Sequence, residues 1–152
     1  MQKIETYEQF VSSYPIITKI PVQWGEMDLA GHVNNVVYCR YAESGRVAYC
    51  DEIEFADFTE KPGVIGPIAA EVRCKYVFPV TYPDTLHIGT RVTNLQEDRF
   101  VMWNGMFSEK YQRMAAICET LIVSYDYFEK RKVPIPQAVI DHIHRLEGVR
   151  QP

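Results

Sequence analysis

Residues 22–46 read VQWGEMDLAGHVNNVVYCRYAESGR, and this stretch decides how the rest of the chain can be arranged. Asn34 or Asn35 can cap a helix that runs to about Asp51, because an Asn side chain accepts hydrogen bonds from first-turn amides. The helix is rich in Tyr, Val, Ala and Gly. Its charges are mainly those of Arg40, Glu43 and Arg46. A helix with so few charges is typical of one enclosed by a sheet.

The segments before this helix predict a short helix and a strand. Residues 6–14, TYEQFVSSY, carry Thr6 and Gln9 at the spacing of a capping box, with the apolar side chains on one face. A strand is expected over about 17–24, and Pro21 favours an edge position or a bulge, because proline cannot donate a hydrogen bond to a neighbouring strand.

The segments after the long helix predict a loop, four strands and a closing helix. The loop contains Pro62 and Gly63. Strands are expected at 68–78, 86–92, 100–108 and 114–125, because these runs alternate apolar and polar residues or are apolar throughout. In the first run, Ile68, Ala70, Val72, Cys74, Tyr76 and Phe78 would share one face. Short polar connections make the strands antiparallel neighbours, and a last helix follows Pro134 and Pro136.

The order of elements predicts an α+β fold in which one antiparallel sheet wraps around a long central helix. A chain of 152 residues has the size of one domain, so we expect a single domain over residues 1–152. Its core would cover about 17–127, with terminal helices at about 6–14 and 136–147.

The composition excludes several classes of function. A net charge of −4 argues against general binding to nucleic acid or to anionic membranes. No apolar run approaches the roughly 18 residues that span a membrane, and the N-terminus lacks the pattern of a secretory signal. These features predict a cytoplasmic protein. The four cysteines are expected to be free, buried thiols, and the scattered histidines predict no metal site.

The loop before the long helix brings together residues that fit acyl-transfer chemistry. The N-terminus of a helix presents unpaired N–H groups, which can stabilise the oxyanion formed when a carbonyl is attacked. Asp28 lies seven residues before Asn35 and can supply the attacking carboxylate or a general base. His32 lies in the same loop, and Gly31 lets backbone and ligand approach closely.

Each of these residues also has an ordinary structural explanation. An Asp before a helix is commonly a cap or turn residue, and His32 can be a hydrogen-bonded structural histidine. One of the two asparagines can serve only as the helix cap. Glu43 lies three residues from Arg40 and from Arg46, so it can form structural salt bridges. Tyr38, like other tyrosines of the helix, can belong to the core.

The segment DLAGHVNNVVY resembles the signature of hot-dog-fold acyl-CoA thioesterases of the 4-hydroxybenzoyl-CoA thioesterase type. The later run CKYVFPVTYPDTLHIGTRV is also similar to that family, so the resemblance covers roughly residues 17–127. The positions that match the family's motif are Asp28, Gly31, His32, Val33, Asn34, Asn35, Tyr38, Glu43 and Arg46.

The resemblance implies a hydrolase that cleaves acyl-CoA, or acyl carrier protein, thioesters. It implies that Asp28 acts as nucleophile or general base, while the amide at about Asn35 polarises the thioester carbonyl. Glu43 is the alternative catalytic acid, because other thioesterases of this fold use a Glu in the helix. His32 is a further catalytic candidate. Substrate contacts are expected from Gly31, Asn34 and Tyr38.

The expected partners follow from this assignment. No cofactor is expected beyond CoA as part of the substrate, and a homodimer or a dimer-of-dimers tetramer would cover the apolar edges of the sheet. Arg73, Lys75 and Arg91 point away from the core face in the strand pattern and are candidates for CoA contacts, although a solvated face is the ordinary explanation.

Two other functions stay open from the sequence. A non-catalytic acyl-CoA-binding protein is one, although the terminal helices are short and acidic for the DNA-binding segment that such sensors carry. A hydratase or dehydratase of the same fold is the other. In those enzymes the Asp and His stand five residues apart, whereas Asp28 and His32 stand four apart.

Overall fold

The structure, a computed structural model, describes residues 4–55 and 64–148. Its elements in chain order are α1 (Tyr7–Ser13), β1 (Ile16–Pro21), the 3-10 turn η1 (Trp24–Glu26), α2 (Asn35–Glu52), β2 (Ile65–Tyr76), β3 (Thr85–Thr93), β4 (Arg99–Ser108), β5 (Arg113–Asp126), β6 (Arg131–Lys132) and α3 (Gln137–Leu146). The expected loop at Pro62 and Gly63 lies outside the described residues.

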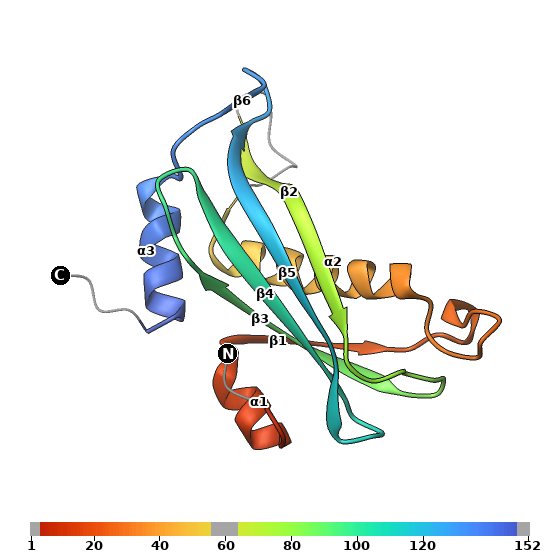
Figure 1. The fold of residues 1–152 in the computed structure, drawn as a ribbon. Helices are drawn as coiled ribbons and strands as arrows, with labels where there is room; N and C mark the ends of the chain where they lie inside the picture. The colour runs from red at the N-terminus through yellow and green to blue at the C-terminus, as the bar shows by residue number, and fades with distance from the viewer. Residues whose placement is uncertain (1–3, 56–63, 149–152) are drawn as a thin grey trace.

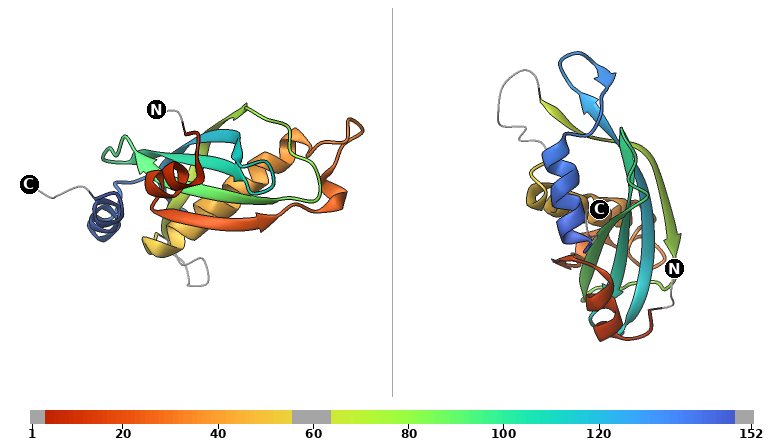
Figure 2. Two further views of the ribbon diagram at one scale, coloured as in Figure 1. Left: turned by 90° about the horizontal axis from the view of Figure 1, so that it is seen from below. Right: turned by 90° about the vertical axis from the view of Figure 1, so that its left-hand side faces the viewer.

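The strands form one antiparallel sheet in the order β1-β3-β4-β5-β2, and β6 pairs with β5. The sheet curls around α2, as Figures 1 and 2 show. The predicted α+β fold, a single hot-dog domain with a long helix against a curved sheet and a short helix near each end, is confirmed. Pro21 ends β1, which pairs only with β3, so the predicted edge position is also confirmed.

Helix α2 packs very closely on the concave face of the sheet at Gly45. A Cβ at this position would lie 2.7 Å from Oγ1 of Thr90 and 2.9 Å from Nδ2 of Asn104. The helix buries one face, and the opposite face stays exposed at Val36 and Val47. The sheet of this chain therefore covers α2 on one side and does not enclose it.

The two short helices cover opposite ends of the sheet. The capping box predicted for α1 is present, since Oγ1 of Thr6 accepts from the Gln9 amide and the Gln9 side chain accepts from the Thr6 amide. Phe10 and Tyr14 then pack on the convex face, where Gly89 and Gly105 leave room for the Tyr14 ring. Helix α3 packs its buried side chains beside the C-terminal half of α2.

A β-bulge in β2 corrects the predicted strand pattern. The register with β5 shifts between Ala69 and Glu71. One extra residue moves the side chains before it to the other face, so Ile68 and Val72 do not share a face as the alternation predicted.

The cysteines also differ from the prediction. Cys74 and Cys118 lie directly opposite each other on β2 and β5, with 4.2 Å between their Cα atoms, and form a disulfide. Cys39 is exposed. Cys50 is a free thiol in the interior, and burial raises the pKa of its thiol to about 12. The expectation of four free, buried thiols is therefore wrong.

Two absences concern only the residues that the structure describes. None of the helices within 4–55 and 64–148 combines the length and the apolar character needed to cross a membrane. The same residues contain no group of three or more His, Cys, Asp or Glu side chains that could hold a metal ion.

The close packing at Gly45 predicts that Gly45→Ala destabilises the protein. Ala ordinarily gains about 1 kcal/mol over Gly inside a helix. Here the added methyl group must displace buried side chains, and overpacking costs about 1–3 kcal/mol. We expect urea unfolding to show a lower free energy of unfolding for Gly45→Ala. Gly25→Ala is the control, because no atom lies within 4 Å of its added Cβ. A Gly45→Ala variant more stable than the wild type would contradict the close contact.

Candidate active site

The loop between η1 and α2 holds Asp28 at the corner of a tight turn. The Asp28 amide donates to the His32 carbonyl at 2.9 Å, and the Gly31 amide donates to the Asp28 carbonyl at 3.0 Å. Gly31 has a φ of +75°, which glycine adopts without strain. Oδ1 of Asp28 accepts from the Ala30 amide at 2.8 Å. Asp28 therefore shapes the turn with one oxygen and stays exposed to solvent.

Glu26 fastens this loop to α2. Its Oε2 accepts from the Tyr41 hydroxyl at 2.5 Å and from the Gln23 amide at 2.7 Å. Burial and the neighbouring Glu26 carboxylate raise the pKa of Tyr41, so its hydroxyl stays protonated and donates. The Asn34 amide donates to the Glu26 carbonyl at 2.9 Å, which joins the loop to the start of the helix.

In the first turn of α2, the backbone amide of Asn35 has no hydrogen-bond partner among the described residues. Asn34 is the N-cap, and its Oδ1 accepts from the Val36 amide at 3.0 Å. The Val37 amide donates to the Asn34 carbonyl at 3.0 Å. The amide of Asn35 donates to none of the described residues. The carbonyl of Asn35 accepts from the Tyr76 hydroxyl at 3.1 Å, so β2 holds this turn in place.

Asp28 and Asn35 line the same cavity, which has a volume of about 300 Å³. Its other lining residues are His32, Val33, Tyr38, Tyr76, Val77, Phe78 and Pro79. The rings of Tyr38 and Tyr76 meet edge to face with centroids 5.2 Å apart. Burial raises the pKa of Tyr38, whose oxygen accepts from the Val80 amide. The imidazole of His32 makes no hydrogen bond with the described residues. Asp28, the first turn of α2 and the aromatic walls thus border one small space.

A comparison with protein families identifies the family to which this chain belongs. The model of the thioesterase-like superfamily matches residues 22–143, which include the whole loop, α2 and the sheet from β2 to β6. The chain belongs to the thioesterase-like superfamily. A comparison with curated proteins finds no match.

Solved structures of thioesterases are similar to this superfamily member. The PA2801 protein of Pseudomonas aeruginosa is 27% identical, with a TM-score of 0.74 over 84% of this chain and 96% of that one. A thioesterase of Thermus thermophilus, solved with coenzyme A and zinc, is 26% identical, with a TM-score of 0.77 over 91% and 97% of the two chains. A thioesterase superfamily structure from Jannaschia sp. CCS1 is 21% identical, with a TM-score of 0.82 over 97% and 95%, and shows the fold alone.

Glu43, the alternative catalytic acid, lies away from the Asp28 cavity. It is exposed on α2 and lines a separate cavity of about 640 Å³ that also includes Asn34. Eight helical residues separate Glu43 from Asn35, which is about 12 Å along the helix axis. The expected salt bridges of Glu43 are absent, because neither Arg40 nor Arg46 lies within ion-pair distance in the described structure.

The structure also separates the three candidate basic residues. Arg73 and Lys75 line a third cavity, on the convex face of the sheet. Arg91 lies elsewhere, where Nη1 donates to the Ser13 carbonyl at 3.4 Å and Nη2 lies 3.6 Å from Oε2 of Glu147. The ion pair joins β3 to the end of α3, so the structure gives Arg91 a role in packing.

Sequence reasoning missed several residues of the site. Tyr76, Val77 and Phe78 form one wall of the Asp28 cavity, although the pattern marked Tyr76 and Phe78 only as strand residues. The sequence feature that could have indicated this wall is the pair of aromatic residues Tyr76 and Phe78 at the end of β2. Glu26 was also missed, because its partner Tyr41 lies 15 residues away.

The hydrogen bond between Tyr41 and Glu26 predicts that Tyr41→Phe loosens the loop that carries Asp28. The change removes a hydrogen bond to a charged group, which is worth about 1.5–3 kcal/mol. We expect amides over 24–33 to exchange faster with deuterium by mass spectrometry. Tyr7→Phe is a matched control, because it removes the hydroxyl bonded to His87 at 2.8 Å, far from this loop. Equal exchange over 24–33 in both variants would show that Tyr41 does not hold the loop.

Proposed function

We propose that this protein hydrolyses acyl-CoA thioesters to a free acid and a thiol, with Asp28 as the catalytic carboxylate. One observation carries the proposal, namely that Asp28 lines the same cavity as Asn35, whose backbone amide has no partner among the described residues. Membership of the thioesterase-like superfamily supports it. The Thermus thermophilus relative solved with coenzyme A supports CoA as the thiol carrier. An acyl carrier protein thioester is the alternative carrier.

The proposed reaction begins with the thioester carbonyl between Asp28 and the N-terminus of α2. The Asp28 carboxylate attacks the carbonyl carbon, or it takes a proton from a water molecule that attacks. The negative charge that develops on the carbonyl oxygen is stabilised by the Asn35 amide and by the positive end of the helix dipole. The carbon–sulfur bond then breaks, and the thiolate of CoA takes up a proton. If Asp28 is the nucleophile, water hydrolyses the resulting anhydride and restores the carboxylate.

The walls of the Asp28 cavity favour a small or single-ring acyl group. Tyr38, Tyr76 and Phe78 offer aromatic surfaces, and the volume of about 300 Å³ lies at the lower end of ligand pockets, which span about 300–1,000 Å³. This agrees with the resemblance of DLAGHVNNVVY to the 4-hydroxybenzoyl-CoA thioesterase type. We therefore propose that type of substrate over a long-chain acyl group, and we propose a cytoplasmic location.

We further propose that the protein works as a homodimer or a dimer-of-dimers tetramer. Strand β2 lies at the edge of the sheet, with 12 residues and a neighbour on one side only. It exposes large apolar side chains along this edge at Ile68, Val72 and Tyr76. Long apolar edges of this kind promote pairing with another chain. Sedimentation at micromolar concentration should show a dimer or tetramer, and an active monomer would overturn this proposal.

Asp28→Asn should abolish most of the chemistry while the fold survives. The Asn side chain keeps an oxygen for the Ala30 amide but lacks the charge needed for attack or proton abstraction. Loss of a general base costs about 10²–10⁴ in rate, so we expect kcat to fall at least about a hundredfold. KM and the melting temperature should stay near those of the wild type, because the amide of Asn35 is unchanged.

Glu43→Gln is the matched control for this experiment. It removes one carboxylate charge from a different cavity, and we expect it to retain most of its turnover. If Asp28→Asn keeps its activity and Glu43→Gln loses it, the helix acid carries the reaction. If the wild type binds acyl-CoA but turns over no thioester, the protein is an acyl-CoA-binding protein and the proposed hydrolysis is wrong.

A further inference from the structure

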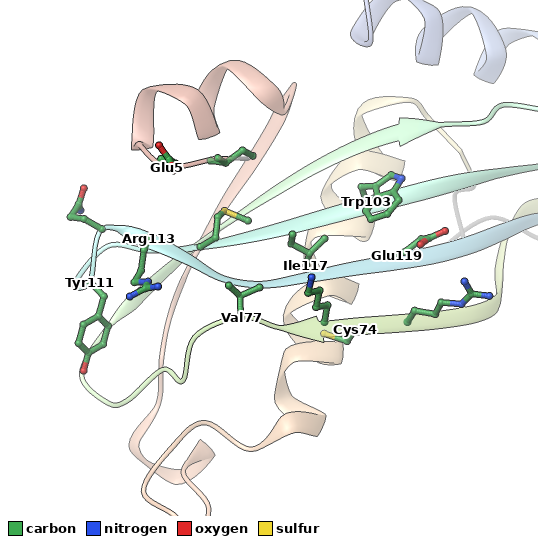
Figure 3. Close-up of a pocket in the computed structure, with 13 residues that line it drawn as sticks. Glu5, Cys74, Val77, Trp103, Tyr111, Arg113, Ile117 and Glu119 are labelled. Atoms are coloured by element: carbon green, nitrogen blue, oxygen red, sulfur yellow. The ribbon is translucent and has the colours of Figure 1, made fainter. Parts of the chain in front are cut away.

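A large cavity of the described structure plays no part in the proposed chemistry. It lies on the convex face of the sheet, opposite α2, and has a volume of about 990 Å³ (Figure 3). Strands β2, β4 and β5 form its floor, and the segment before α1 borders it near Glu5. We call this cavity the outer groove.

Two cations in the outer groove have no acidic partner among the residues that the structure describes. Arg73 pairs with Glu71 through its Nε. Lys75 and Arg113 also line the groove, and no carboxylate of the described residues lies within 4.0 Å of either charged group. Two unpaired cations in a chain with a net charge of −4 form a local site for an anion.

Packing fixes the position of Arg113. Its guanidinium lies over the ring of Phe78, 4.4 Å from the centroid. The Phe78 ring packs in turn against Tyr111, with centroids 4.9 Å apart. A guanidinium that lies over an aromatic face still has N–H groups that can bind phosphate oxygens in pairs.

An aromatic ring lies at the other end of the groove. Trp103 on β4 is opposite Glu119 on β5, which is opposite Arg73 on β2. Neighbouring strands are about 4.8 Å apart, so the Trp103 backbone lies about 10 Å from β2, the strand that carries Lys75. The indole Nε1 donates to Oγ1 of Thr93 at 3.0 Å, which fixes the ring. Figure 3 shows Trp103 and Glu119 together at this end, with Arg113 and Tyr111 at the other.

The outer groove and the Asp28 cavity lie next to each other at the end of β2. Val77 lines both cavities. Phe78 lines the Asp28 cavity while it supports Arg113 of the groove. Lys75 and Arg113 lie on the two sides of Val77, and Trp103 lies beyond Lys75. A ligand that passes Val77 would therefore come between the two cations before it reaches Trp103.

We propose that the outer groove binds the nucleotide end of coenzyme A, an inference that rests on the proposed function. The order of the groups matches the order of the molecule. The pantetheine arm would pass Val77, the diphosphate would meet Lys75 and Arg113, and the adenine ring would pack on Trp103. Glu119 lies at the adenine end, where the amino group of the base can donate to a carboxylate, and away from the unpaired cations.

Adenosine 3′,5′-bisphosphate tests the groove without any hydrolysis. The chain has two tryptophans, so in a Trp24→Phe background Trp103 is the sole source of indole fluorescence. We expect the bisphosphate to quench this fluorescence with saturation. Arg113→Gln and Lys75→Gln should each raise its Kd at least about tenfold, the effect of losing one charge-assisted contact of about 1.4 kcal/mol. Arg131→Gln, on the exposed strand β6, removes the same charge and should change nothing.

Kinetics in the wild-type background complete the test. Arg113→Gln and Lys75→Gln should raise KM for an acyl-CoA about tenfold and leave KM for the matching acyl N-acetylcysteamine thioester unchanged. Lys75 is exposed on an edge strand, so Lys75→Gln keeps the test valid if Arg113→Gln unfolds. The absence of quenching, or equal Kd values for Lys75→Gln and Arg131→Gln, would overturn the assignment of the groove.

The two proposals fail in different ways. If the bisphosphate binds and Lys75→Gln weakens it, but no thioester is cleaved, the groove assignment stands and the proposed hydrolysis fails. If acyl-CoA is cleaved with an Asp28-dependent rate, but Lys75→Gln and Arg113→Gln leave KM unchanged, the hydrolysis stands and the groove assignment is wrong.

Discussion

The close contact of α2 with the sheet at Gly45 is the constraint on which the site depends. Below Gly45, Nδ2 of Asn104 donates to Oγ1 of Thr90 at 2.8 Å, and both side chains are fully buried. A buried polar pair of this kind is costly to disrupt, and it fixes the depth at which the helix can lie. Because α2 is one continuous helix, its distance from the sheet at Gly45 also determines the position of the Asn35 amide in its first turn. The donor of the site is thus positioned by packing about 15 Å away along the helix.

The carboxylate of the site is positioned by a second, separate set of contacts. The turn at Asp28 is closed by its own hydrogen bonds, and Glu26 fastens it to Tyr41 on α2. Tyr41 lies almost two turns into α2. The loop is therefore attached to the same helix that carries the Asn35 amide. A small movement of α2 would carry both groups together and preserve the distance between them. This arrangement suits a reaction that needs a nucleophile and an oxyanion donor in fixed register.

The features that could be predicted from the sequence are those with local causes. The capping box of α1 and the cap of α2 depend on neighbouring residues, and Asp28 and Asn35, within eight consecutive residues, do line one cavity. The bulge in β2 was not predicted, because one extra residue leaves the alternation on each side intact. The pairing of Cys74 with Cys118 depends on the register of two strands 44 residues apart, which alternation does not specify. Alternation also assigned Arg91 to a face without showing that the end of α3 covers it.

The segment just after β2 explains how one strand end can line both the outer groove and the Asp28 cavity. At Val77 the chain leaves the sheet, and its amide and that of Phe78 both donate to the Ala115 carbonyl, at 2.8 and 3.0 Å. This double contact turns the chain around the edge of the sheet, so that neighbouring residues face different surfaces. Phe78 can then form a wall of the Asp28 cavity with one part of its ring and support Arg113 with its face. A sheet edge with such a turn therefore connects its concave and convex surfaces over two residues.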